Sequence, residues 1–284
     1  MVAALLLAIR SRGDDGAPTE FALPFGLEHV EGTEAVGRPA LYDHEPYTFD
    51  GSPVQIRSLI AVYRVPAENP GAVFLDWIEQ LDELAVTEVV VKAGSTPSEP
   101  WLMAESVNPF RPDGPPPDVA YLRLWATKGD PILSVEIDRA AAAPDPGRIR
   151  ITGDRGRLPA PPAASDDDDR KAGDLLFEER GTKVRLPEGA ATDVPTFTRA
   201  AGTGGTFSVF FAEDAEDAVE ALLRDVRATS DDEEVTGPEK STVAGVKAVS
   251  ASFNLPAGGW GFDVVAVQGP DDEEATVYVT SFAD

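Results

Sequence analysis

The sequence predicts an α+β protein made of two related units, each an antiparallel sheet with one amphipathic helix packed on a face. Three observations predict it: two segments with helical apolar spacing, a strand before each, and a faint internal repeat at an offset of about 145 residues. Strands do not alternate with helices along the chain, which disfavours a parallel doubly wound sheet. The class follows from the order of the elements and not from any motif.

The two predicted helices each carry one apolar stripe. In the first, the apolar positions are Val73, Phe74, Trp77, Ile78, Leu81 and Leu84. In the second, they are Ala215, Ala218, Val219, Leu222, Leu223 and Val226. The first helix is expected to begin at Asn69 as N-cap with Pro70 as its first residue, and the second is expected to be capped by Asp214. Each stripe should therefore pack on a sheet, with Trp77 in the core.

A strand is expected before each helix, over 59–65 and over 206–211. In the second segment Phe207, Val209 and Phe211 alternate with other residues, as in a strand with one buried face. A meander should follow each helix. The two meanders supply the repeat, because Met103 precedes Val249, and Ile132 precedes Val277, by nearly the same interval. The alternative is that two antiparallel units resemble each other only in composition.

Changes in composition divide the chain into four parts. The predicted parts are an apolar N-terminal remnant and tether (1–18), a first α+β unit (19–139), a linker rich in Pro, Ala and Asp (140–173), and a second α+β unit (174–284). The linker contains a candidate edge strand near 148–152. Whether the halves form one body or two domains is left open by the sequence.

The charge balance excludes some partners. The chain has 50 Asp and Glu against 24 Lys and Arg, for a formal net charge of −26. Nucleic acid is not an expected partner, because phosphates are bound by clustered Lys and Arg. There is no Cys and there are only two His residues, so thiol chemistry and multi-histidine metal sites are excluded. We expect no cofactor and no metal site.

The N-terminal segment 2–9 is apolar but too short to span a bilayer, which takes about 20 apolar residues. It lacks the basic start and the small-residue cleavage site of a secretory signal. Our hypothesis is a truncated membrane anchor or signal that precedes a flexible tether, which places the protein outside the cytoplasm, membrane-anchored or secreted. The alternative is the frayed end of a cytoplasmic protein.

Searches for catalytic and metal-binding motifs return only weak candidates. The polar cluster Asp43, His44 and Glu45 is one, but in an extended chain Asp43 and Glu45 point away from His44 and cannot share one ion with it. The acidic runs at 166–169, 231–234 and 271–274 lack the ligand spacing of a calcium loop. Solvated loops are the simpler interpretation of all three runs.

One aromatic residue is a candidate partner contact. Trp260 lies between glycines in Gly258-Gly259-Trp260-Gly261, where it could anchor a partner or fold back over its own sheet. The leading functional prediction is a non-enzymatic, envelope-associated or secreted binding module with an unknown protein or small-molecule partner. The alternatives are an enzyme that uses carboxylates in a cleft between the two halves, and a cytoplasmic structural or regulatory protein. A convergent pair of carboxylates would favour the enzyme.

Overall fold

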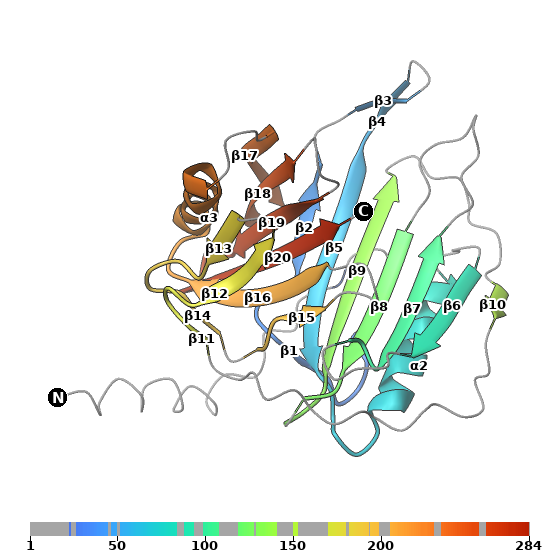
Figure 1. The fold of residues 1–284 in the computed structure, drawn as a ribbon. Helices are drawn as coiled ribbons and strands as arrows, with labels where there is room; N and C mark the ends of the chain where they lie inside the picture. The colour runs from blue at the N-terminus through green and yellow to red at the C-terminus, as the bar shows by residue number, and fades with distance from the viewer. Residues whose placement is uncertain are drawn as a thin grey trace.

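The computed structural model is an α+β protein of mostly antiparallel sheets with two helices (Figure 1). It describes residues 23, 27–44, 47–49, 52–83, 88–93, 99–107, 119–127, 129–140, 150–152, 170–179, 182–192, 194–198, 205–229, 234–255 and 260–283. Two large sheets dominate this part of the chain. The apolar segment 2–9 and most of the linker lie outside the described residues.

The first sheet contains the strands around the first helix. The main elements in chain order are β5 (Ile56–Arg64), α2 (Pro70–Glu83), β6 (Glu88–Ala93), β7 (Leu102–Val107), β8 (Val119–Trp125) and β9 (Ile132–Ala140). Shorter strands complete the sheet: β1 (Glu34–Ala35), β2 (Ala40–Asp43) and β10 (Arg150–Thr152). The order across the sheet is β1-β5-β9-β8-β7-β6-β10, with β2 also beside β5. β10 pairs in parallel with β6 at one edge and lies in the range expected for an edge strand.

The second sheet contains the strands around the second helix. Its main elements are β16 (Thr206–Ala212), α3 (Ala215–Thr229), β17 (Glu234–Val243), β18 (Val246–Leu255), β19 (Trp260–Gln268) and β20 (Ala275–Ala283). The short strands are β11 (Arg170–Lys171), β14 (Ala191–Thr192) and β15 (Phe197–Thr198). The order is β11-β14-β16-β20-β19-β18-β17, with β15 also beside β16. Two hairpins stand apart, β3–β4 (Tyr47–Phe49, Ser52–Val54) and β12–β13 (Leu175–Glu179, Thr182–Arg185).

The main strands have the same order in both sheets, β5-β9-β8-β7-β6 in one and β16-β20-β19-β18-β17 in the other. In each, the helix follows the first of these strands. The central strands, however, differ in register. Val119 lies opposite Asp138, whereas Val264 lies opposite Val279 and not Ala283, which a constant offset would require. A constant interval therefore aligns the helices but not the central strands.

The helices begin and pack as their sequences predict. Asp214 caps α3, because its Oδ1 accepts hydrogen bonds from the backbone N–H groups of Glu216 (2.8 Å) and Asp217 (3.1 Å). Pro70 is the first residue of α2, where its missing N–H leaves no bond unmade. Val73, Phe74, Trp77 and Ile78 of α2 are buried, as is the apolar stripe of α3, and Trp77 and Leu222 are each 0% exposed.

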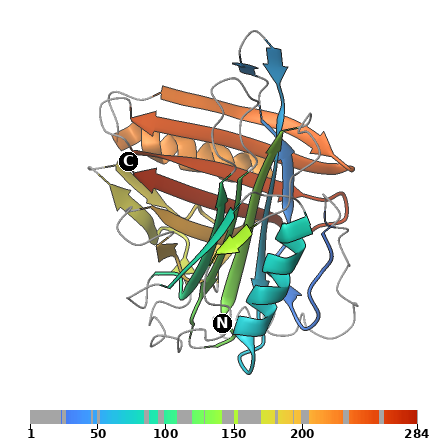
Figure 2. The same ribbon diagram turned by 90° about the vertical axis from the view of Figure 1, so that its right-hand side faces the viewer.

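Alternation along the strands divides the apolar side chains among three cores. On β5, Leu59 and Ala61 pack with α2, whereas Ile60 and Val62 face the other way, toward the second sheet. A separate core lies between α3 and the second sheet. The layers are thus helix, sheet, sheet and helix, and the strands of the two sheets cross steeply (Figure 2). Buried residues of both halves therefore meet in one of the three cores.

Gly37 and Arg38, just before β2, connect the two sheets through contacts with the second sheet. Arg38 forms a two-pronged ion pair with Asp272, and its backbone N–H donates to Thr276 Oγ1 at 2.9 Å. The Tyr278 hydroxyl donates to the Arg38 carbonyl at 2.8 Å. Gly37 has a φ of 72°, and a Cβ there would lie 2.5 Å from Thr276 Oγ1, so only glycine fits this crossing. This segment fixes β2 beside the second sheet.

Candidate functional site

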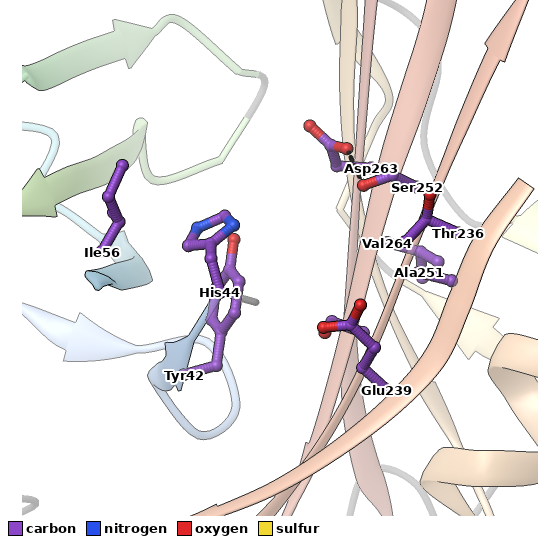
Figure 3. Close-up of a pocket in the computed structure, with 10 residues that line it drawn as sticks. Tyr42, His44, Ile56, Thr236, Glu239, Ala251, Ser252, Asp263 and Val264 are labelled. Carbon is purple, nitrogen blue, oxygen red and sulfur yellow. Dashed lines mark hydrogen bonds between the residues drawn. The ribbon is translucent and has the colours of Figure 1, made fainter. Parts of the chain in front are cut away.

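A cavity of about 250 Å³ opens between the two sheets, beside β2 and the start of β5 on one side and β17, β18 and β19 on the other. Its lining residues are Tyr42, His44, Ile56, Thr236, Glu239, Ser250, Ala251, Ser252, Asp263 and Val264. In Figure 3, Tyr42 and His44 form one wall, while Glu239 and Asp263 extend from the opposite wall. We call this cavity the intersheet cleft. It joins residues that are remote in sequence.

Strand alternation explains how the predicted polar cluster is divided. Tyr42 and His44 point into the intersheet cleft, whereas Asp43 points to the other face and pairs with Arg57 across the strands, at 2.6 and 2.9 Å. The hydrogen bonds from Arg57 lower the pKa of Asp43. Glu45 lies outside the described residues. Of the two members of the cluster that the structure describes, His44 lines the cleft and Asp43 does not.

His44 belongs to a hydrogen-bonded chain that leads into the first sheet. Its Nε2 lies 2.6 Å from Ser58 Oγ, and the Ser58 hydroxyl donates to Asp138 Oδ1. The order is histidine, serine, aspartate, so the serine is in the middle. In a nucleophilic triad the histidine stands between the other two and takes the serine proton. Ser58 is also only 1% exposed, so its oxygen is not available for attack.

The second sheet presents a similar pair on the opposite wall. Ser252 donates to Asp263 Oδ1 at 2.6 Å, and these residues are direct neighbours across β18 and β19. Ser58 and Asp138 are likewise direct neighbours across β5 and β9. Each sheet thus contributes one aspartate held by a serine on the adjacent strand. Both aspartates remain accessible to solvent.

The electrostatic field at the cleft is negative. The protein packed around Asp138 raises its pKa although part of the side chain stays open to solvent, and repulsion from Glu136 and Asp263 adds to the rise, while Ser58 and His44 oppose it. Burial also raises the pKa of the Tyr42 hydroxyl, with further contributions from Asp138 and Asp263. Carboxylates of both sheets therefore act on the same small region.

Arg123 and Glu136 form a buried ion pair in the first sheet, and the pair carries no net charge. Arg123 forms an ion pair with Glu136 on the face of the first sheet that also carries Asp138. The Arg123 guanidinium also lies over the Tyr121 ring, 4.6 Å from its centroid. Because these opposite charges cancel, Arg123 leaves the negative charge of the cleft largely uncompensated.

Replacing Asp138 by asparagine should stabilise the protein at neutral pH. A carboxyl whose pKa is raised by folding costs stability once ionised; this cost is absent below the unfolded pKa of about 3.9 and grows as pH rises through the folded pKa. Solvent screening at this exposed carboxyl reduces the cost, so Asp138→Asn should raise the melting temperature at pH 7 by no more than about 2–4 °C. The gain should shrink toward pH 4.

The control for this prediction is Asp76→Asn on the exposed face of α2. It removes the same charge far from the cleft and should change the melting temperature little at either pH. Thermal melts monitored by circular dichroism would compare the two variants. A lower melting temperature for Asp138→Asn at pH 7 would show that the ionised carboxylate stabilises the fold.

Of the two arrangements open to Trp260, the structure has the one in which the ring folds back over its own sheet. Its ring is 2% exposed and packs against Phe253 and Phe262, with centroids 5.5 and 6.3 Å away. It begins β19 and belongs to the core beneath α3. The flanking glycines suggested a loop tip, but the aromatic cluster buries the indole. Trp260 is therefore not an exposed anchor for a partner.

The other candidates do not gather at a site. His29 packs edge-on against Tyr63, with centroids 5.9 Å apart. In the acidic run 271–274, Asp272 is engaged by Arg38 and by the backbone N–H of Gly269. The run at 166–169 lies outside the described residues. Among the residues that are described, no three His, Asp or Glu side chains are close enough to hold a metal ion.

Sequence reasoning missed most of the cleft. Ser58 and Asp263 interrupt β5 and β19, which are otherwise largely apolar, so each looks like an ordinary interruption of the pattern. A usable signal was present in β9, where Ser134, Glu136 and Asp138 alternate with buried Val135 and Ile137. This pattern gives β9 one polar face. Polar residues that face inward are the unusual observation in a core.

Comparisons with known proteins add little. No family model and no curated protein matches the chain. One solved structure is weakly similar, a conserved protein of unknown function with a hot dog fold from Alicyclobacillus acidocaldarius. It is 13% identical, the match covers 86% of this chain and 95% of that one, and the TM-score is 0.16. A TM-score this low carries no inference about fold or function.

Within the described residues, neither helix has the length and apolarity needed to cross a membrane.

Proposed function

We propose that this protein is a non-enzymatic binding module whose ligand occupies the intersheet cleft. The observation that carries the proposal is that both sheets contribute polar side chains to one cavity, with His44 on one wall and Glu239 and Asp263 on the other (Figure 3). Polar groups that converge on a concave site are typical of a ligand pocket. Its size, about 250 Å³, is below the roughly 300–1,000 Å³ of drug-sized pockets, which suits a small ligand or a single side chain.

A β-bulge places part of the lining. The register of β17 and β18 shifts between Thr236 and Glu239, so both residues line the cleft although their spacing would otherwise put them on opposite faces. Gly237 makes the bulge feasible, since its φ is 101° and a Cβ there would lie 2.7 Å from the Ser250 carbonyl oxygen. Bulges of this kind commonly re-aim a side chain next to a functional site.

An enzyme that uses carboxylates in the cleft is the second candidate. It is favoured by Asp138 and Asp263, which come from different sheets and interact electrostatically across the space between them. A raised pKa on one member of such a pair suits a general acid. Turnover of a bound ligand, abolished by Asp138→Asn, would select this candidate over simple binding.

We also infer that the two units are related by duplication. Their shared strand order supports this, as does the alignment of Phe74 and Trp77 with Val219 and Leu222 at one interval. The unequal register of the central strands would then reflect later divergence. On this view the cleft is a composite site, formed where two copies of one unit face each other.

For the location, we propose attachment outside the cytoplasm through the N-terminal segment. The apolar run 2–9 and the Gly, Asp and Pro residues after it support this proposal. A protein of that kind would present the cleft to ligands in an extracytoplasmic space. A cytoplasmic structural or regulatory role is the alternative, and fractionation of cells that produce the protein would separate the two.

Blocking the cleft tests the binding proposal. Thr236 is exposed on β17 and lines the cleft, so Thr236→Trp should fill the cavity while leaving the core intact. The control is Thr242→Trp, which adds the same ring at an exposed position of the same strand, away from the cleft. In a screen of small metabolites by ligand-observed NMR, hits should bind the original chain and Thr242→Trp and lose at least about tenfold in affinity for Thr236→Trp. Hits that bind Thr236→Trp unchanged would contradict the proposal.

A further inference from the structure

The charges of the cleft lining indicate its ligand. Of the ten described residues that line the cavity, Glu239 and Asp263 are acidic, His44 is the only residue with a basic side chain, and none is Lys or Arg. Asp138 reinforces the negative field through Ser58. Resting on the proposed binding function, we infer that the intersheet cleft binds an organic cation, a primary ammonium or guanidinium group.

The wall opposite the acids is aromatic. Tyr42 and His44 lie with ring centroids 5.0 Å apart and a 44° tilt, and both line the cavity. A cation over the face of an aromatic ring such as that of Tyr42 is attracted by the electrons of the ring, most strongly when it is desolvated. A site with a ring on one wall and carboxylates on the other therefore suits an organic cation. A halide or a phosphate would meet repulsion from the same carboxylates.

Two carboxylates on the second wall are placed to receive the cation. Ser252 fixes Asp263 by its hydrogen bond, so this carboxylate is held in position before a ligand arrives. Glu239 is aimed at the cavity by the bulge and is half-buried. No hydrogen bond or ion pair to another described residue engages its carboxylate. The two acids come from β19 and β17, and because β18 lies between these strands their backbones are about 10 Å apart, a separation that suits an extended organic cation better than a point ion.

The cationic group could belong to a free amine or to a Lys or Arg side chain of a peptide. The cavity is small enough that both sources present the same chemistry to it. Three matched compounds isolate the charge: 1,5-diaminopentane is the cation, 1,5-pentanediol the neutral analogue and glutarate the anion. Agmatine adds the guanidinium group, and capped Gly-Lys-Gly tests the peptide source.

The experiment is calorimetric titration of the full chain with each compound at physiological salt. We expect 1,5-diaminopentane or agmatine to bind one to one, and the diol and glutarate to show no binding. Glu239→Gln and Asp263→Asn should each lower the affinity for the cation by at least about tenfold. Binding of capped Gly-Lys-Gly more tightly than of both free amines would assign the natural ligand to a peptide.

The matched control is Glu220→Gln on the exposed face of α3. It removes one charge from a chain whose net charge is −26, so it measures general attraction of cations to the surface. Equal weakening by Glu220→Gln and Glu239→Gln would overturn the inference, and so would the absence of binding by any cation. If the diol binds as well as the diamine and Thr236→Trp blocks both, cation selectivity fails while the binding function stands.

Discussion

Replacing Trp125 by alanine is expected to lower the free energy of unfolding by about 3–5 kcal/mol. Trp125 is 0% exposed and lies in the core between the sheets. It ends β8 of the first sheet and stacks on Phe197 and Phe207 of the second, with ring centroids 4.6 and 5.9 Å away. The loss combines the transfer energy of a large ring with a cavity at the contact between the halves.

Urea denaturation followed by circular dichroism would measure the effect of Trp125→Ala. Leu175→Ala is the control, because Leu175 is 37% exposed and its removal should change stability by no more than about 0.5 kcal/mol. If Trp125→Ala lowers the free energy of unfolding by no more than about 0.5 kcal/mol, the two sheets do not share a core in solution. The cleft, which exists only because the sheets face each other, would then have to be abandoned as a site.

The helices could be predicted because their signals are local. A stripe such as Phe74, Trp77 and Ile78, with Pro70 at the start, determines both the helix and its buried face within a few turns. The packing of one sheet on the other left no such signal. Alternation shows that Ile60 faces away from Leu59, but not which surface it meets. That choice depends on contacts between residues more than 100 positions apart, such as Arg38 with Asp272.

The site was less predictable than the fold for the same reason. His44 was singled out with its chain neighbours Asp43 and Glu45, whereas its actual partners are Ser58 and Asp138 on other strands. A site assembled across strands and sheets has no fixed sequence spacing. Such a site forms where the register of neighbouring strands brings side chains together, and this register is set by pairing between residues that are distant in sequence.

The constant sequence offset of about 145 residues aligns the two helices correctly but not the strands of the two sheets. A shift of one or two residues turns the buried stripe of a helix by about 100–200° and exposes it, and the stripes of α2 and α3 align at one interval. Two strands can slide by an even number of residues and still keep the same faces buried. Val119 and Val264 occupy such shifted positions relative to their partners Asp138 and Val279. Sequence offsets in the meanders therefore do not give the structural alignment.

Trp77→Ala and Trp260→Ala should both be strongly destabilising, each by about 3–5 kcal/mol. Trp77 lies on the buried face of α2, 0% exposed, with its ring 5.3 Å from that of Tyr63. Trp260 has the corresponding burial in the other half, where it closes the aromatic cluster beneath α3. The burial of Trp260 makes a large loss the expected result, although the residue stands between glycines.

Denaturant melts of both tryptophan variants, with Glu79→Ala on the exposed face of α2 as the control, would decide the matter. The control should stay within about 0.5 kcal/mol of the original chain. Because the halves share a core, we expect one cooperative transition in each variant, shifted to lower urea with little change in slope. A large loss for Trp77→Ala beside a small one for Trp260→Ala would return Trp260 to the surface, where an indole between glycines is an anchor for a partner.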